Sequence, residues 1–348
     1  MILDGNTPAA ITAAAQALCS GALLGLPTET VYGLAADASS DSAVAQIFAA
    51  KGRPSDHPLI VHVADAGGIA HFASAVPAFA QALVDAFWPG PLTLILPRRA
   101  GVASAATGGQ DSVGLRCPAH PVALAVWRAC AANGVWGVAA PSANRFGRVS
   151  PTTAAHVQSE FGAVLPDLLV LNGGACAVGI ESTIVDCTRG AAVLLRPGAI
   201  TRAQIEAACG QRLLLKEELQ AQTPRASGTL LAHYAPSAPV RLMDAAALQA
   251  ALAARSADAP ALALYARTPL HGPAHAALRT VVLHAMPSDA AAAAAELFAM
   301  LRRFDDQGAG EIWIETPPST PDWEGVRDRL QRAAAATAAT ATVAVSAR

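Results

Sequence analysis

Residues 51–62 of this chain read K-G-R-P-S-D-H-P-L-I-V-H, and residues 140–152 read A-P-S-A-N-R-F-G-R-V-S-P-T. Both stretches place basic and small polar side chains beside Gly and Pro turns. Charged residues make up only 14% of the chain, against about 25% in a typical soluble domain. Because charge is this scarce, its concentration at two turns indicates an anion-binding site rather than a solvated face.

Helical and strand patterns alternate around both stretches. A helix is predicted over residues 42–50, ended by Gly52 and Pro54, and a strand over residues 59–63. Further elements are expected through the first 210 residues, which we take as one α/β domain. The expected strands cover residues 22–27, 92–96, 113–116, 137–140, 168–172, 182–186 and 193–196, and the expected helices cover 77–87 and 121–133, with another starting near 201.

Residues 211–239 differ from both of their flanks. They contain three prolines and few periodic apolar residues, which is typical of a linker. Residues 240–348 alternate again and predict a smaller, Rossmann-like α/β domain. Its strands are expected at residues 240–243, 261–265, 281–284 and 311–315, and its helices at 245–254, 289–304 and 323–336. This part lacks G-x-G-x-x-G, so no dinucleotide site is expected there.

The composition excludes several classes of function. The formal net charge is −2, and no run of Lys or Arg indicates a nucleic-acid groove, so stable nucleic-acid binding is not expected. None of the six cysteines forms a C-x-x-C pair, which argues against zinc and for reduced, buried thiols. The phosphate-loop, zinc-protease and serine-hydrolase motifs G-x-x-x-x-G-K-[ST], H-E-x-x-H and G-x-S-x-G are absent from the sequence.

An uncharged stretch over residues 8–27 resembles a signal peptide at first sight. It lacks a positive leader, and Gly21 and Gly25 interrupt it before it reaches transmembrane length. We read it as an Ala-rich helix followed by a buried strand, and expect a cytoplasmic protein that does not enter a membrane.

The first basic stretch supplies candidate phosphate ligands. A cation in the last turn of a helix stabilises the helix dipole, so Lys51 has a purely structural interpretation. Arg53 lies beyond the glycine stop and is fixed by Pro54, and a guanidinium held in this way is suited to bind two phosphate oxygens. His57 and His62 at the two ends of the next strand strengthen the prediction of a ligand site.

Polar side chains also follow other predicted strands. P-T-E-T-V-Y-G at residues 27–33 places Thr28, Glu29 and Thr30 after an apolar strand, where ligands bind in open α/β sheets; a plain strand-to-helix turn is the alternative. Arg116 ends V-G-L-R and needs a partner, either a substrate carboxylate or a structural carboxylate. The small donors of the second stretch could bind phosphate or ribose, although such residues are also common in turns.

The order of these motifs carries more information than any one of them. P-T-E-T-V-Y-G, K-G-R-P-x-x-H-P-L-I-x-H, W-P-G-P-x-T, V-x-L-R-x-P, A-P-S-A-N-x-x-G-x-x-S-P-T, E-S-T-I-V-D and L-R-P-G-x-I follow one another over about 170 residues. This arrangement resembles the YrdC-like L-threonylcarbamoyladenylate synthase family. With the linker motif H-Y-A-P and the tail domain, the whole chain resembles the long, two-domain form.

The resemblance implies a twisted mixed sheet with helices and a positively lined cleft. It implies a nucleotidyltransferase that joins L-threonine, bicarbonate or CO2, and ATP into threonylcarbamoyl-AMP and pyrophosphate, with Mg²⁺ on the ATP. A separate complex would use the product for tRNA threonylcarbamoyladenosine modification. No enzyme nucleophile is needed, since positioning and charge stabilisation by Lys51 and Arg53 suffice. The linker would act as a lid that excludes water.

The resemblance also assigns residues. Threonine contacts fall on Thr30, His62, Arg116, the main chain of Ala140, and Ser182; ATP contacts fall on Lys51, Arg53, His57, Ser112, Ser142, Asn144, Ser150, Arg196 and Tyr234. The chain departs from the family at two places. Position 57 is often Asn but is His57 here, and the linker reads A-S-G-T-L-L-A-H-Y where the family usually has S-P-G-M-K-x-x-H-Y, so one basic linker contact is in doubt.

Two other interpretations compete with the synthase. A non-catalytic RNA-binding module could use the same positive cleft, although the net charge argues against it. A carbamoyltransferase of hydrogenase maturation contains a related domain, but such chains are longer and carry Cys-rich zinc motifs that this sequence lacks.

Overall fold

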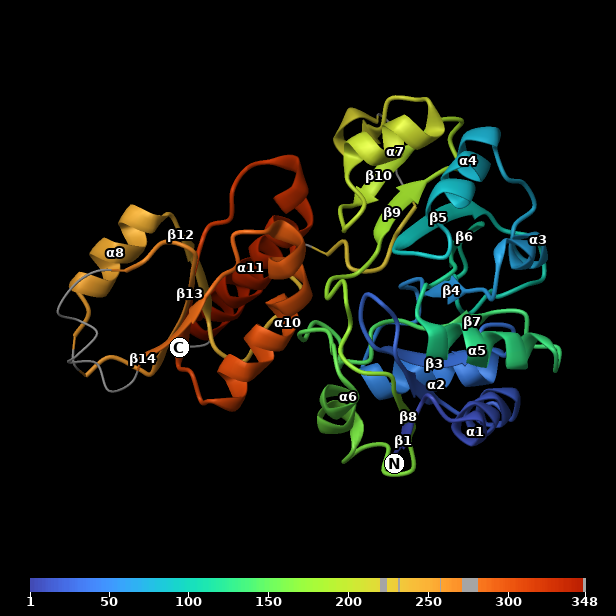
Figure 1. The fold of residues 1–348 in the computed structure, drawn as a ribbon, viewed down its shortest axis with the longest axis horizontal. Helices are drawn as coiled ribbons and strands as arrows, with labels where there is room; N and C mark the ends of the chain where they lie inside the picture. Colours follow the sequence, from blue (N-terminus) through green and yellow to red (C-terminus); the bar gives the residue numbers. More distant parts are fainter. Residues whose placement is uncertain (220–223, 231, 257, 271–280, 347–348) are drawn as a thin grey trace. The chain divides into compact units, whose positions relative to one another are not determined.

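A computed structural model describes residues 1–219, 224–230, 232–256, 258–270 and 281–346 (Figure 1). Its contacts divide the chain into two compact units. The first contains Met1–Phe146 and Ser150–Thr229, and the second contains Gly147–Val149 and Leu230–Arg348. The boundary between residues 229 and 230 falls inside the segment 211–239 that we predicted as the linker.

In the described part of the chain, the first unit holds an 11-stranded sheet in the order β1-β8-β2-β3-β7-β4-β6-β5-β9-β10-β11. Its pairs are both parallel, as in β4–β6 and β5–β9, and antiparallel, as in β3–β7 and β5–β6. The predicted mixed sheet is therefore confirmed. The strands are β1 Ile2–Asp4, β2 Leu24–Leu26, β3 Gly33–Asp37, β4 Ile60–His62, β5 Leu92–Pro97, β6 Ser112–Arg116, β7 Val138–Ala139, β8 Leu169–Asn172, β9 Thr183–Asp186, β10 Val193–Arg196 and β11 Leu214–Leu215.

Helices cover this sheet on both faces. Leu34 and Ala36 of β3 belong to one apolar cluster and Ala35 to another, as expected when successive side chains point to opposite faces. Helices α1 and α5 pack side by side on the second cluster, and α4 packs against α7 (Figure 1). The helices are α1 Pro8–Cys19, α2 Asp41–Lys51, α3 Ile69–Phe72, α4 Ala78–Phe87, α5 Pro121–Ala131, α6 Ala154–Phe161 and α7 Arg202–Cys209, with 3-10 turns at η1 Ala66–Gly68 and η2 Lys216–Glu218.

Helix α2 begins and ends at the residues that its sequence predicts. The Ser40 hydroxyl accepts a hydrogen bond from the Ala43 N–H, and Gly52 ends the helix in the left-handed conformation at φ 61°. Only glycine adopts this conformation readily. The chain then turns so that the Arg53 N–H donates to the Phe48 carbonyl, which fixes the start of the segment that carries the candidate phosphate ligands.

Three features of the first unit differ from the sequence predictions. The segment P-T-E-T-V-Y-G joins the antiparallel strands β2 and β3, so it is not a strand-to-helix turn. Strands β1 and β3 and helices α3 and α6 were not predicted, since none of them has a clear periodic pattern. The segment 211–239 is also not wholly irregular, because its β11 pairs in parallel with β10.

Among its described residues, the second unit contains a four-stranded parallel sheet in the order β12-β15-β13-β14. Its all-parallel pairing fits the predicted Rossmann-like pattern of alternating strands and helices. The strands are β12 Val240–Met243, β13 Leu262–Ala266, β14 Val281–Ala285 and β15 Glu311–Glu315, and the helices are α8 Ala245–Ala253, α10 Ala290–Asp306 and α11 Glu324–Ser346, with η3 at Pro321–Trp323. Across the described residues of the chain, no helix has the length and apolarity to span a membrane.

Candidate functional site

Arg116 lies at the end of β6, and its guanidinium is held on three sides. Nη2 donates to the Glu29 carboxylate at 2.6 Å, Nη1 donates to the Thr30 hydroxyl at 2.8 Å, and Nε donates to the Gly90 carbonyl at 3.1 Å. The arginine is 3% exposed. A guanidinium has five N–H donors, and three of them donate within the described residues. The remaining two can bind an anion such as a carboxylate at both of its oxygens.

His62 lies beside Arg116, because the two residues are register partners on the parallel strands β4 and β6. The imidazole is 3% exposed and packs against Trp127, with 5.7 Å between the ring centroids. Burial, and secondly the charge of Arg116, hold the pKa of His62 well below its usual range. The imidazole is therefore neutral at neutral pH.

Ser182 and Arg196 form a second buried group. Nε and Nη2 of Arg196 both donate to the Ser182 carbonyl, at 3.1 and 2.8 Å, and the Ser182 hydroxyl lies 2.7 Å from that of Thr93. The glycine of the motif R-P-G is required here for space. A Cβ at Gly198 would lie 2.5 Å from the Thr183 nitrogen, so any side chain would displace the backbone that presents Ser182.

Lys51 is buried at the end of α2 and holds the second basic stretch in place. Its Nζ donates to the carbonyls of Ser142, at 2.6 Å, and Asn144. Burial, and secondly the charge of Arg53, hold the pKa of Lys51 well below its usual range. An ammonium has three N–H donors, and one of them makes no hydrogen bond to the described residues. Lys51 can therefore organise the loop and still contact an anion.

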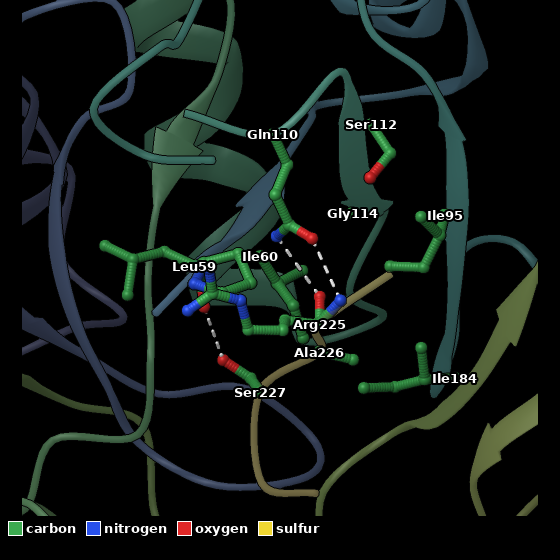
Figure 2. A pocket seen from close by; sticks show the side chains of 11 residues that line it. Leu59, Ile60, Ile95, Gln110, Ser112, Gly114, Ile184, Arg225, Ala226 and Ser227 are labelled. Atoms are coloured by element: carbon green, nitrogen blue, oxygen red, sulfur yellow. Dashed lines mark hydrogen bonds between the residues drawn. The ribbon is translucent and has the colours of Figure 1, made fainter. Parts of the chain in front are cut away.

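Arg53 and Arg196 both hold the linker residue Ser227. Arg53 Nη2 donates to the Ser227 hydroxyl at 3.0 Å, and Arg196 Nη1 donates to the Ser227 carbonyl at 2.8 Å. Figure 2 shows the small pocket that residues 225–227 enter, where the Gln110 side-chain amide exchanges two hydrogen bonds with the Arg225 backbone. The linker is thus bound to two of the predicted phosphate ligands.

The remaining predicted nucleotide ligands surround these groups in the first unit. The Ser150 hydroxyl lies 2.5 Å from the Glu181 carboxylate, and both residues are buried. His57 packs its ring against Phe146, and burial, together with Arg53, lowers the pKa of this histidine. Ser112 is the first residue of β6 and contributes to the pocket of Figure 2.

Two further predicted residues are placed differently. Ala140 follows β7, and its N–H donates to the Ile60 carbonyl on β4, so it lies next to the strand that carries His62. Tyr234 belongs to the second unit, where it is buried against Phe298 and Arg329. The other predicted site residues all lie in the first unit.

Sequence reasoning did not assign roles to four residues that complete this arrangement. Glu29 pairs with Arg116, Glu181 pairs with Ser150, and Gln110 and Ser227 hold the linker. Glu29 and Glu181 stand in motifs that the sequence analysis singled out, P-T-E-T-V-Y-G and E-S-T-I-V-D. A carboxylate with little exposure needs a polar partner, so these motifs indicate that each glutamate is paired but not with which residue.

Two family models match the chain. The Sua5/YciO/YrdC model, described as "Telomere recombination", matches residues 16–198, and the model of the "Threonylcarbamoyl-AMP synthase, C-terminal domain" matches residues 200–335. The chain belongs to the Sua5/YrdC family. The predicted family, in its long two-domain form, is confirmed.

Named members of the Sua5/YrdC family align with most of the chain. A threonylcarbamoyl-AMP synthase of Pyrococcus abyssi is 41% identical over 236 residues, 67% of this chain and 68% of the relative. One of Bacillus subtilis is 42% identical over 244 residues, 70% and 68% of the two chains. The crystal structure of Pyrococcus abyssi Sua5 complexed with L-threonine superposes with a TM-score of 0.83 at 33% identity and covers 94% of both chains.

Proposed function

We propose that this chain is an L-threonylcarbamoyladenylate synthase, a nucleotidyltransferase. It forms threonylcarbamoyl-AMP and pyrophosphate from L-threonine, bicarbonate or CO2, and ATP, and the product serves tRNA threonylcarbamoyladenosine modification. The main support for this proposal is the geometry of Arg116. The buried guanidinium of Arg116 is oriented by three fixed acceptors and keeps two donors for a carboxylate, which is what recognition of a small amino acid requires.

The threonine site is built around that guanidinium. Arg116 binds the threonine carboxylate, and Thr30 and His62 lie beside the bound amino acid because both are neighbours of Arg116. The Ala140 main chain and the Ser182 hydroxyl supply further hydrogen bonds. Removing an arginine from such a pair costs about 2–5 kcal/mol when its partner stays buried, so this group dominates threonine affinity.

The ATP site is rich in cations and small donors, and the proposed reaction needs no enzyme nucleophile. The attacking group is the threonine carbamate, whose oxygen displaces pyrophosphate from the α-phosphorus. Lys51 and Arg53 contribute by charge stabilisation and positioning, as in other phosphoryl transfers. The proposed ATP contacts are Lys51, Arg53, His57, Ser112, Ser142, Asn144, Ser150, Arg196 and Tyr234.

Mg²⁺ enters this scheme with ATP rather than as a metal of the protein. The donors in the nucleotide region are ammonium, guanidinium, hydroxyl and amide groups, which suit phosphate oxygens. In proteins that use ATP, Mg²⁺ is held largely by the phosphates and water. We further propose that the protein acts in the cytoplasm, passes its product to a separate tRNA-modifying complex, and uses the linker with Tyr234 as a lid over the nucleotide.

The direct test is turnover by the purified full-length chain. With L-threonine, bicarbonate and Mg-ATP, it should release pyrophosphate and form threonylcarbamoyl-AMP, detected by mass spectrometry. Arg116→Ala should abolish saturation by threonine in the accessible range. Pyrophosphate release that does not depend on threonine, or none at all, would refute the proposal. RNA binding without turnover would instead support the non-catalytic module, and transfer from carbamoyl phosphate would support the carbamoyltransferase.

A further inference from the structure

His62 has an unused ring nitrogen at the centre of the threonine site. Its Nδ1 is wholly buried and has no hydrogen-bond partner among the residues that the structure describes. Leaving a buried polar atom unpaired is costly, so such atoms in native proteins call for an explanation. The proposed chemistry supplies one, because the nitrogen of a bound amino acid would be a partner.

The sheet brings this imidazole within reach of a threonine amine. His62 and Arg116 are paired residues of adjacent parallel strands, so their side chains leave the same face of the sheet. Adjacent strands are about 4.8 Å apart. In an α-amino acid the nitrogen is two bonds from the carboxylate carbon. An amino acid whose carboxylate is bound to Arg116 can therefore reach His62 on the neighbouring strand β4 with its nitrogen.

The surroundings of His62 keep the imidazole neutral before the substrate binds, so its ring has a lone pair that can accept a proton. Trp127 from α5 and Val138 from β7 face it without charge, and its pKa is lowered by burial and then, among the described residues, by the charge of Arg116 from β6. Arg116 in turn donates a hydrogen bond to the Glu29 carboxylate. Binding of the threonine carboxylate neutralises part of the charge of Arg116. The basicity of His62 therefore rises when the substrate is in place.

We infer that His62 is the base that takes the proton from the threonine ammonium, so that the amine can attack CO2. This inference rests on the proposed function. The ammonium loses one proton to the imidazole, and the freed lone pair forms the N–C bond as one C=O π bond of CO2 opens. The nitrogen then loses its second proton to solvent and leaves a carbamate. The carbamate oxygen then attacks the α-phosphorus, and pyrophosphate departs.

Glu29 is the competing proton acceptor, and its contacts argue against it. Its Oε1 accepts from Arg116 at 2.6 Å, and its Oε2 accepts from the Ala119 N–H at 3.1 Å. Both oxygens are therefore engaged in orienting the guanidinium. His62 is the nearby group that combines a neutral state with a vacant acceptor.

The test separates threonine binding from turnover in the full-length protein. His62→Asn keeps a hydrogen-bonding side chain but cannot accept a proton near neutral pH. Its threonine Kd, measured by calorimetry without ATP, should rise by at most about tenfold, the effect of one hydrogen bond. Its kcat for pyrophosphate release at saturating threonine should fall by about 10²–10⁴-fold, the usual contribution of a general base. His62→Ala should regain turnover as imidazole is added.

The pH dependence of kcat distinguishes a base from a residue with a purely structural role. Wild-type kcat should decline toward acid as His62 becomes protonated, whereas the residual kcat of His62→Asn should lack that decline. The matched control is His71→Asn on α3, which should keep wild-type turnover. If His62→Asn retains kcat within a few-fold, or if saturating threonine restores kcat fully, the inference is wrong.

A substitute variant and the activity of the wild type complete the test of His62. His62→Gln replaces His62→Asn, with the same criteria, if the asparagine variant does not fold. A wild-type protein without threonine-dependent pyrophosphate release would refute the proposed function, whereas an active wild type with an active His62→Asn variant would refute only the role of His62.

Discussion

The guanidinium of Arg116 and the carboxylate of Glu29 form an ion pair of 2.6 Å, and the two side chains are only 4% and 12% exposed. The pair joins residues 87 positions apart in the chain. A buried ion pair contributes little net stability in general, because both charges lose their hydration. Its value here is orientation, since Glu29 and Thr30 fix which edge of the guanidinium remains for the substrate.

Glu29→Gln should therefore impair threonine binding rather than ATP binding. The amide keeps the size of the side chain and one acceptor but loses the charge. A charge-assisted hydrogen bond is worth about 1.5–3 kcal/mol, so the KM for threonine should rise at least about tenfold while the KM for ATP stays constant. Steady-state kinetics with each substrate varied in turn measure both.

Asp85→Asn is the control for this variant. Asp85 is exposed on α4 and accepts a hydrogen bond of 2.8 Å from the Gln81 side chain. It should leave both KM values unchanged. Equal increases in the two KM values for Glu29→Gln would contradict the assignment of Glu29 to the threonine side of the reaction.

Lys51→Met should abolish productive ATP use while leaving the protein folded. The thioether removes the donors to the Ser142 and Asn144 carbonyls and the N–H that we assign to phosphate. We expect turnover to fall by about 10²-fold or more, as for removal of one preorganised electrostatic donor. Circular dichroism checks the fold, and Arg128→Met, at an exposed arginine of α5, is the control. Full activity with normal ATP affinity in Lys51→Met would place the phosphate site elsewhere.

The sequence predicts those features of the site that depend on local geometry. Gly52 and Pro54 stop α2 where expected, and the expected strands β4 and β6 place His62 and Arg116 at their ends. Partners that lie far apart in the chain were beyond such reasoning. Lys51 donates to carbonyls 91 and 93 residues away, and no periodicity encodes that contact.

The missed elements have a common physical cause. Strand β3 reads G-L-A-A-D and lacks the β-branched residues that mark a strand, so its pairing between β2 and β7 decides its conformation. Strand β11 has only two residues, and its extended conformation depends on its pairing with the edge of β10. Tertiary context determines such segments more than their own propensity does.

The linker contacts predict a measurable protection pattern. Arg53 and Arg196 hold Ser227, and Arg225 forms an ion pair with Asp56. If the linker closes over the nucleotide, amide hydrogen exchange across residues 225–230 should slow when threonine and a non-hydrolysable ATP analogue are added together.

Ser227→Gly provides the matched variant for this experiment. It removes the hydroxyl that Arg53 holds and should speed exchange across these residues before ligand is added. The amides of β6 report whether the fold has changed and should exchange at the same rate in both proteins. Ligands that leave the exchange of residues 225–230 unaffected would show that the linker is not a lid.

Protonation of His62 predicts how stability depends on pH. Its pKa lies well below 6.5 in the folded protein because of burial and then of Arg116, whereas the unfolded chain has the ordinary value of about 6.5. Below pH 6.5 the unfolded state therefore binds a proton that the folded state does not. The contribution to stability is fully present above that pH and is lost as the pH falls toward the folded pKa.

His62→Asn should flatten this dependence. A group protonated only in the unfolded state contributes about 1.4 kcal/mol of stability per pH unit, so the slope just below pH 6.5 should decrease by up to that amount. His57 and His120, whose pKa values are also lowered by burial, should preserve part of the slope. Urea unfolding at several pH values between 5 and 7 measures it.

Trp127→Phe is the control that separates titration from packing. The indole donates a hydrogen bond of 3.0 Å to the His62 carbonyl, so its loss should lower stability at every pH. It leaves the imidazole in the chain, and the slope of stability against pH should remain that of the wild type. If His62→Asn keeps the wild-type slope, the pKa of His62 is the same in the folded and the unfolded state, and the lowering of this pKa by burial and Arg116 is refuted.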